Sequence, residues 1–262
     1  MNFLYIIGGL VLLVAGGNWL LKSSVGLSQK LNISKIIVGL TVVSFATSAP
    51  EMIVSVKAAL DGFPDIAVGN VVGSNIGNVG LVLGIVLLIN SMQVESNFYR
   101  TDWPMKMLAS LLLFFFLAFD GVLSRSEGIF FVVLLVAFIL YLIKQNKTVT
   151  LENDNQEEEN MSYLKIFLLL FVGGFSLWLG SELLVDGSVN LAEKLGVSKR
   201  IIAITVVSIG TSIPELASSV IAALKNENDI SIGNIIGSNI FNILSVLGFT
   251  AIIKPIENVD YQ

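Results

Sequence analysis

The sequence contains one stretch twice, Thr41-Val-Val-Ser-Phe-Ala-Thr-Ser-Ala-Pro-Glu51 and Thr205-Val-Val-Ser-Ile-Gly-Thr-Ser-Ile-Pro-Glu215. The copies lie 164 positions apart (205 − 41), and 8 of their 11 residues are identical. A second segment, Gly69-Asn-Val-Val-Gly-Ser-Asn-Ile-Gly-Asn78, returns as Gly233-Asn-Ile-Ile-Gly-Ser-Asn-Ile-Phe-Asn242 at the same separation, with 7 of 10 residues identical. Two long matches at one offset indicate that the chain consists of two related halves.

The composition around these repeats is that of a membrane protein. Apolar residues make up 54% of the chain, charged residues 13%, and the mean hydropathy is +0.83. A soluble domain carries about a quarter of charged residues, whereas one membrane-spanning helix needs about 20 mostly apolar residues. We therefore predict an all-α integral membrane protein with about eight spans, at 3–21, 33–60, 66–91, 103–122, 127–143, 163–185, 199–224 and 231–253.

Composition also excludes several classes of function. A net charge of −5 provides no basic face for nucleic acid. The chain has no cysteine, so disulfides and thiolate metal sites are excluded. It has no histidine either, which removes the usual general base and the commonest ligand of transition metals. The apolar N-terminal run lacks a basic start and a cleavage site, and we interpret it as a retained first span.

The spacing of the repeats predicts an inverted architecture. The repeat begins at the first span and again at the sixth, and because five is odd the second copy lies upside down in the membrane. Inverted repeats are typical of transporters, with the site near the midplane where the copies meet. We predict a first half at 1–143, an acidic linker at 144–162 and a second half at 163–262. The second half is expected to be incomplete, because the equivalents of 99–143 would follow Gln262.

Basic residues predict the orientation. Nine of the 15 Lys and Arg fall on one side of the predicted spans and six on the other. Since cytoplasmic loops are richer in Lys and Arg, we expect the N-terminus outside and the acidic linker in the cytoplasm. The cluster of Asp and Glu in that linker is interpreted as a solvated segment between the halves.

The Thr-Ser-x-Pro-Glu motif carries the chemistry. A carboxylate within a membrane helix is costly and marks a pathway or a binding site. Pro50 has no N–H and should kink the helix, which leaves carbonyls near Ala46 and Thr47 without partners. Thr47 and Ser48 lie four and three residues before Glu51, so the three share one helix face. The second half provides the same set at Thr211, Ser212 and Glu215.

Pooling the two halves predicts an all-oxygen cation site. Two bidentate glutamates offer four oxygens, and the carbonyls of Thr47 and Thr211 add two. Six hard oxygens and a charge of −2 suit Ca²⁺, whereas Mg²⁺ keeps its waters more firmly. Zinc and copper sites normally use His or Cys, which this chain lacks.

The second motif predicts a polar stripe on a closely packed helix. Asn70, Ser74 and Asn78 recur every four residues, as do their counterparts in the second half, and the glycines of the motif recur at the same spacing. Such glycines allow helices to approach closely, and the Asn and Ser side chains could serve either interhelical hydrogen bonds or a cation site.

Both repeated motifs resemble the alpha repeats of the sodium/calcium exchanger family, prokaryotic type, within the cation/calcium antiporter superfamily. The resemblance covers nearly the whole chain. It implies a cell-membrane antiporter that exchanges Ca²⁺ for Na⁺ by alternating access, with both ions as cargo, no cofactor and no enzymatic activity. The ligands it implies are the two glutamates and the backbone carbonyls of the threonines, Glu51, Glu215, Thr47 and Thr211.

The resemblance extends the expected ligand set to the neighbouring polar residues. Hydroxyls and amides on the same helices complete the sodium sites in that family, which implies Ser48, Ser212, Ser74, Ser238, Asn78 and Asn242. Carbonyls one turn earlier imply Ser44 and Ser208. Two departures matter: some relatives carry Asp at one of the positions that match Asn78 and Asn242, and relatives commonly have ten spans.

Other functions remain open at this point. A proton- or potassium-dependent exchanger would keep the same fold, although proton-coupled relatives tend to have a carboxylate where Asn78 and Asn242 stand. An intramembrane hydrolase using the two glutamates has little support without His or Cys. A passive channel fits broken helices at an inverted-repeat interface less well than alternating access does. The sequence does not indicate an oligomeric state.

Overall fold

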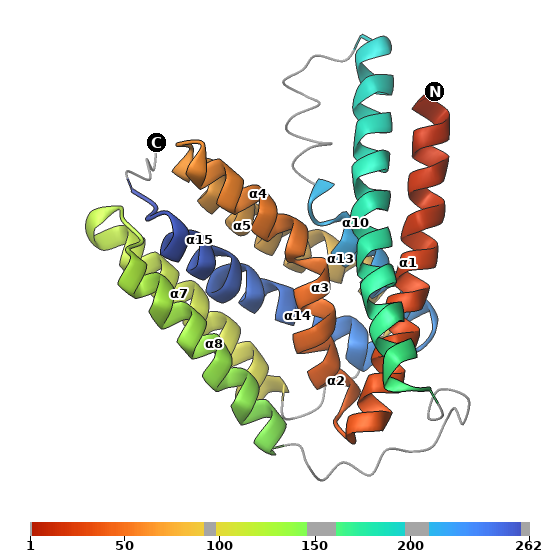
Figure 1. The fold of residues 1–262 in the computed structure, drawn as a ribbon, viewed down its shortest axis with the longest axis horizontal. Helices are drawn as coiled ribbons and strands as arrows, with labels where there is room; N and C mark the ends of the chain where they lie inside the picture. Colours follow the sequence, from red (N-terminus) through yellow and green to blue (C-terminus); the bar gives the residue numbers. More distant parts are fainter. Residues whose placement is uncertain (1, 92–97, 146–160, 197–209, 258–262) are drawn as a thin grey trace.

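The computed structural model describes residues 2–91, 98–145, 161–196 and 210–257 as a helical bundle (Figure 1). Its first half contains α1 (Asn2–Leu31), the broken helix α2 (Lys35–Val38), η1 (Gly39–Val43), α3 (Ser44–Thr47) and α4 (Ala49–Leu60), then α5 (Pro64–Gly77), η2 (Asn78–Val82) and α6 (Leu83–Ile89), then η3 (Phe98–Asp102) and α7 (Trp103–Asp120), and α8 (Arg125–Gln145). Its second half contains α10 (Tyr163–Lys194), α13 (Ile213–Leu224), α14 (Asn228–Phe241), η5 (Asn242–Leu247) and α15 (Gly248–Ile253). Among the described residues, β structure is limited to one isolated bridge between Leu123 and Ile256.

The predicted spans correspond to these helices, with corrected bounds. Six helices are long and apolar enough to cross a membrane, and the bent pair Lys35–Thr47 and Ala49–Leu60 makes up to seven. The spans predicted at 3–21 and 163–185 are too short, since α1 has 30 residues and α10 has 32. Helix α1 continues past Lys22 to Leu31, and within this stretch Ser23 and Ser24 donate hydrogen bonds to the Leu20 carbonyl. The predicted span 199–224 is described only from Gly210 onward.

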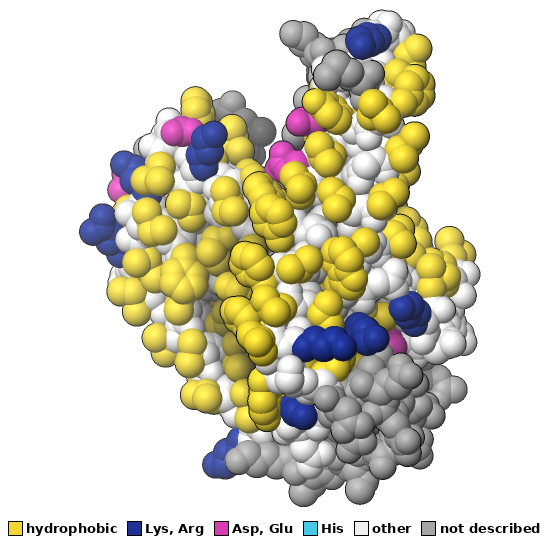
Figure 2. All heavy atoms as spheres, turned by 45° about the vertical axis from the view of Figure 1, so that its right-hand side comes forward, with side chains coloured by type: hydrophobic (Ala, Val, Ile, Leu, Met, Phe, Trp, Pro, Cys, Tyr) yellow, Lys and Arg dark blue, Asp and Glu magenta, His cyan; other side chains and the backbone are white. Residues whose placement is uncertain are grey.

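The outer surface is apolar, as a lipid-facing surface must be. Large side chains such as Leu88 and Phe119 are 90% and 91% exposed. Figure 2 shows hydrophobic side chains over the middle of one face, with Lys and Arg nearer the ends. An apolar surface of this extent would be a liability in water, and it belongs to a multi-pass membrane protein.

Helices α1 and α10 form a close pair that is related by the internal repeat. They run side by side in Figure 1 and are more upright in that view than α4, α7, α8 and α15. A Cβ atom on Gly9 would lie 2.7 Å from the carbonyl oxygen of Gly180, and one on Gly16 would lie 2.9 Å from that of Gly173. Gly173 and Gly180 are the repeat counterparts of Gly9 and Gly16, so the contact is the same when the halves are exchanged. This is the packing expected of an inverted repeat.

The hairpin of α7 and α8 buries helices of the second half more than the equivalent helices of the first half. The hairpin of α7 and α8 packs on α14, η5 and α15, where a Cβ on Gly128 would lie 2.7 Å from the Gly248 carbonyl. In the span Asn228–Ile253, 89% of the residues in its 18-residue apolar window are buried, whereas in the counterpart Pro64–Ile89 the share is 22%. The predicted close glycine contacts therefore hold for Gly233 and Gly237, which meet α2 and η1, while Gly69 and Gly73 have open space beside them among the described residues.

Candidate cation site

A break in the helix positions each glutamate. Ser48 has φ −84° and ψ 2°, and Ser212 has φ −87° and ψ 4°, so both halves leave the helical conformation at the same point. In the first half, the segments before and after the break are bent by 45°, as the proline at position 50 predicted. A new helix starts after each break and has proline and glutamate in its first turn. Both carboxylates thus lie at a helix N-terminus, where the helix dipole favours negative charge.

Both carboxylates are completely buried and only partly satisfied. Glu51 and Glu215 are each 0% exposed, and both lie at the interface between the two halves of the chain, where hydroxyl groups of each half surround them. Ser74 Oγ donates to Glu51 Oε1 and Ser48 Oγ donates to Glu215 Oε1, each at 3.4 Å. The second oxygen of each carboxylate has no hydrogen-bond partner among the described residues. Two buried anionic oxygens, one from each half, are therefore free to bind a cation.

Hydroxyl pairs join the two halves beside the carboxylates. Thr47 Oγ1 lies 3.2 Å from Ser238 Oγ, and Ser74 Oγ lies 3.3 Å from Thr211 Oγ1. The second pair is the repeat counterpart of the first, so the symmetry seen between α1 and α10 continues into the interior. The structure thus brings together four of the residues that the sequence predicted as ligands.

The two predicted asparagine ligands begin distorted helical turns. Asn78 is the first residue of the π-helix η2, and Asn242 is the first residue of η5. Both are 0% exposed. Both amide atoms of Asn78 and the oxygen of Asn242 lack partners among the described residues. Single π-helical turns within α-helices occur frequently at functional sites, and here they occur at the same place in both halves.

For three other predicted ligands, the structure gives less support for a role in cation binding. Ser212 is buried, and its Oγ would lie 3.6 Å from a Cβ on Gly77. The Ser44 carbonyl already accepts hydrogen bonds from the Ser48 N–H (2.9 Å) and the Thr47 hydroxyl (3.4 Å), so a cation would have to displace one of them. Ser208 lies outside the described residues.

A second layer of polar residues, absent from the predicted ligand set, supports the site. Asn234 Nδ2 donates to Ser218 Oγ and Ser219 Oγ, both at 2.9 Å, and its oxygen accepts from the Thr47 hydroxyl at 3.1 Å. In the first half, Asn70 Nδ2 donates to Ser55 Oγ at 3.0 Å. The repeated Asn at spacing four was the available signal for this layer, because each Asn is the first member of its polar stripe.

A cavity approaches the site from one side. It has a volume of about 540 Å³, lies between α4, α5 and α10, and is lined by Pro50, Gly73 and Thr211. The first two directly precede Glu51 and Ser74, and Thr211 contacts Ser74. Glu182 and Trp178 of α10 also line it. The cavity therefore reaches the polar centre without exposing the carboxylates.

Comparison with known proteins extends over both halves. The chain matches the family described as sodium/calcium exchanger protein over residues 1–144 and 165–262. CaxA of Alkalimonas amylolytica is 40% identical over 259 residues, 96% of this chain and 81% of that protein. Sodium/calcium exchanger MaX1 of Methanosarcina acetivorans is 32% identical over 296 residues, 98% of this chain and 84% of that protein. The structure of the sodium-calcium exchanger NCX_Mj soaked with zero Na⁺ and Ca²⁺ matches with a TM-score of 0.83 and 29% identity, covering 98% of this chain and 83% of that one.

Proposed function

Because the chain belongs to the sodium/calcium exchanger family, we propose that it uses Na⁺ as the counter-ion for Ca²⁺ in its exchange of cations across the membrane. The observation that carries the proposal is the pair of buried carboxylates, one from each half, each with one oxygen free of hydrogen bonds. These are hard oxygen ligands of the kind that Ca²⁺ and Na⁺ prefer. The protein performs no covalent chemistry, and its substrates are the two ions.

The proposed ligands combine anionic and neutral oxygens. Glu51 and Glu215 supply the charge, and the carbonyls of Thr47 and Thr211 come from the residues that precede the two helix breaks. Side-chain oxygens complete the site, supplied by Ser48, Ser212, Ser74, Ser238, Asn78 and Asn242. The carbonyl of Ser44 would join when one of its current hydrogen bonds opens, and we assign the carbonyl of Ser208 the same role by its position in the repeat. Support comes from the hydroxyl pairs that already bring Thr47 to Ser238 and Ser74 to Thr211.

Exchange follows from the charge of the empty site. Two buried carboxylates without counter-ions are costly to carry across the apolar part of the membrane, by several kcal/mol. The change between inward-facing and outward-facing states therefore proceeds readily only when the site is filled by Ca²⁺, by Na⁺ or by protons. Each change of state that carries an ion in one direction must be followed by a return with an ion bound in the other direction, and this coupling is antiport.

The amides favour Na⁺ over H⁺ as the counter-ion. Asn78 and Asn242 are neutral and do not titrate, so the centre of the site offers two carboxylates and no further proton acceptor of that kind among the described residues.

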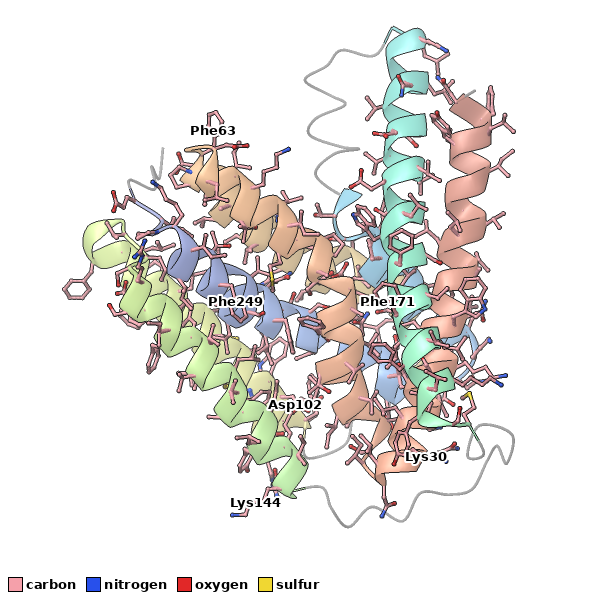
Figure 3. All side chains as sticks on the ribbon, viewed as in Figure 1. Lys30, Phe63, Asp102, Lys144, Phe171 and Phe249 are labelled. Carbon is pink, nitrogen blue, oxygen red and sulfur yellow. The ribbon has the colours of Figure 1, made fainter. Side chains whose placement is uncertain are left out.

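We also propose that the N-terminus lies outside and the acidic linker in the cytoplasm. Lys30 and Lys144 lie at one end of the molecule and Phe63 at the other (Figure 3). The two lysines belong to the larger basic set, which the positive-inside rule assigns to the cytoplasm. The loop that follows α4, and the cavity beside it, would then face outward.

The test is ⁴⁵Ca²⁺ uptake into vesicles containing the purified protein under imposed gradients. We expect uptake when the vesicles are loaded with Na⁺ and diluted into Na⁺-free buffer, and none when they are loaded with K⁺ or choline at the same ionic strength. Uptake driven equally well by a proton gradient, or uptake that requires K⁺, would contradict the proposal. Equal uptake without any counter-ion would indicate a channel.

A further inference from the structure

Asn75 lies between the two halves and connects two amides of the same motif. Its Nδ2 donates to the backbone carbonyl of Asn239 at 3.2 Å, and its Oδ1 accepts from Asn242 Nδ2 at 3.1 Å. Asn75 belongs to α5, while Asn239 and Asn242 belong to α14 and η5. Asn75 belongs to the second repeated motif and is not among the proposed ligands.

The direction of these hydrogen bonds is fixed by the backbone. A carbonyl oxygen can only accept, so the end of the Asn75 amide that faces the Asn239 carbonyl must be the NH₂ group. The oxygen of Asn75 then faces Asn242, which must present its own NH₂ group in return. The oxygen of Asn242 is consequently turned away from Asn75. It is buried and has no partner among the described residues.

The orientation of the Asn242 amide matters because only its oxygen can bind a cation. Its oxygen is a ligand for Na⁺ and Ca²⁺, and its NH₂ group is repelled by them. A half-turn of the Asn242 side chain would replace the ligand atom by a donor. A cation alone would have to select the correct orientation, whereas the bond from Asn75 selects it before the cation arrives.

The counterpart in the other half is not arranged in this way. Asn239 is the repeat equivalent of Asn75, and neither of its side-chain polar atoms has a partner among the described residues. Both amide atoms of Asn78, the equivalent of Asn242, are likewise without partners there. The arrangement therefore orients one of the two central amides in this conformation.

We propose that Asn75 is a positioning residue that aims the oxygen of Asn242 at the transported cation. The proposal rests on the proposed function, in which Asn242 is a ligand. Asn75 touches no cation itself, and its effect passes through Asn242. Because the Asn239 carbonyl can only accept, it fixes the orientation of the Asn75 amide, and Asn75 in turn fixes the orientation of the Asn242 amide.

The test compares Asn75→Ala in two backgrounds by ⁴⁵Ca²⁺ binding to the purified full chain. With Asn242 present, Asn75→Ala should raise the half-saturating Ca²⁺ concentration about fivefold, the factor for one average hydrogen bond. In the Asn242→Asp background the same substitution should not raise it. A carboxylate presents an oxygen at both ends and needs no aiming. A role in stability alone would lower binding equally in both backgrounds, and this result would overturn the proposal.

Two further variants separate the possible failures. Asn239→Ala is the matched control, and its effect should be the same with Asn or Asp at position 242. If Asn242→Ala binds Ca²⁺ as the unaltered protein does, Asn242 is not a ligand, and both the ligand assignment and the positioning role are wrong. If Asn242→Ala weakens binding while Asn75→Ala does not, the ligand assignment stands and the positioning role alone is overturned. Size-exclusion profiles show whether each variant is folded.

Discussion

Glu51 and Glu215 occupy equivalent positions but have different hydrogen-bond partners. Glu51 accepts from Ser74 of its own half, whereas Glu215 accepts from Ser48 of the opposite half. If the halves were arranged identically, the counterpart of the Ser74 bond would be a hydrogen bond from Ser238 to Glu215. The counterpart of the Ser48 bond would be a hydrogen bond from Ser212 to Glu51. Two copies of one sequence therefore hold two arrangements in a single structure. Alternating access between inverted repeats requires such a difference.

Gly77 is where the two repeated motifs differ most, because Phe241 takes its place in the second half. A Cβ on Gly77 would lie 3.6 Å from Ser212 Oγ, which is an ordinary contact. We predict that Gly77→Ala keeps Ca²⁺ binding close to that of the unaltered protein, whereas Gly77→Phe lowers it at least about tenfold because the ring displaces Ser212. Equilibrium ⁴⁵Ca²⁺ binding measures both. Equal binding by the Phe variant would show that Ser212 is not a ligand in this site.

The free-energy cost of burying a charged side chain explains which site residues could be predicted from the sequence. Glu51 and Glu215 were predictable because a carboxylate within an apolar helix needs a functional reason. The choice of hydroxyl for each carboxylate was not predictable. Repeated residues predict repeated bonds, and the structure breaks that symmetry at Ser48 and Ser74. The directing role of Asn75 was also hidden, because it depends on a backbone carbonyl that no residue type identifies.

At the scale of helices, breaks and π-turns shape the site. The break at Ser48 was predictable from Pro50, which lacks an N–H group. The π-turns that begin at Asn78 and Asn242 were not, because their residues are also compatible with an ordinary α-helix. Helix lengths were underestimated for α1 and α10, since hydropathy falls at charged residues although both helices continue past them. A hydropathy window marks the apolar part of a helix and not its ends.

The contact between α1 and α10 gives a prediction with an adjacent control. Gly9→Leu should lower the free energy of unfolding by about 1–3 kcal/mol, because the new side chain would overlap the Gly180 backbone. Gly8→Leu should be neutral, since nothing lies within 4 Å of a Cβ at that position. Thermal unfolding of both variants in detergent measures the difference. Equal melting temperatures would mean that α1 and α10 do not pack as closely as described.

At the scale of the molecule, the two halves differ in how far they are covered. The hairpin of α7 and α8 packs on α14, η5 and α15 and contacts Gly248, whereas among the described residues nothing lies within 4 Å of a Cβ on Gly84, the counterpart of Gly248. The repeat and the all-helical fold were predictable from the 164-residue offset. The packing of the α7–α8 hairpin on α14, η5 and α15 was not predictable, since helix contacts cannot be read from hydropathy.

The orientation in the membrane can be tested because the chain has no cysteine. A single Cys introduced at Asp61, in the loop after α4, should react with an impermeant maleimide only from the outside. A Cys introduced at Asn155 in the acidic linker should react only from the cytoplasmic side. Labelling of right-side-out and inverted vesicles gives both measurements. The reverse pattern would place the N-terminus in the cytoplasm.

The central claim is that one carboxylate from each half binds the transported cation, and ⁴⁵Ca²⁺ uptake into Na⁺-loaded vesicles tests it most directly. Removing either charge from the buried pair should cost about 3–5 kcal/mol of cation binding, or a factor of at least about a hundred. Glu51→Gln and Glu215→Gln should therefore each reduce uptake to background. Asp186→Asn, which alters an exposed carboxylate on α10, should transport normally. Full uptake by either glutamine variant would contradict a site shared between the two halves.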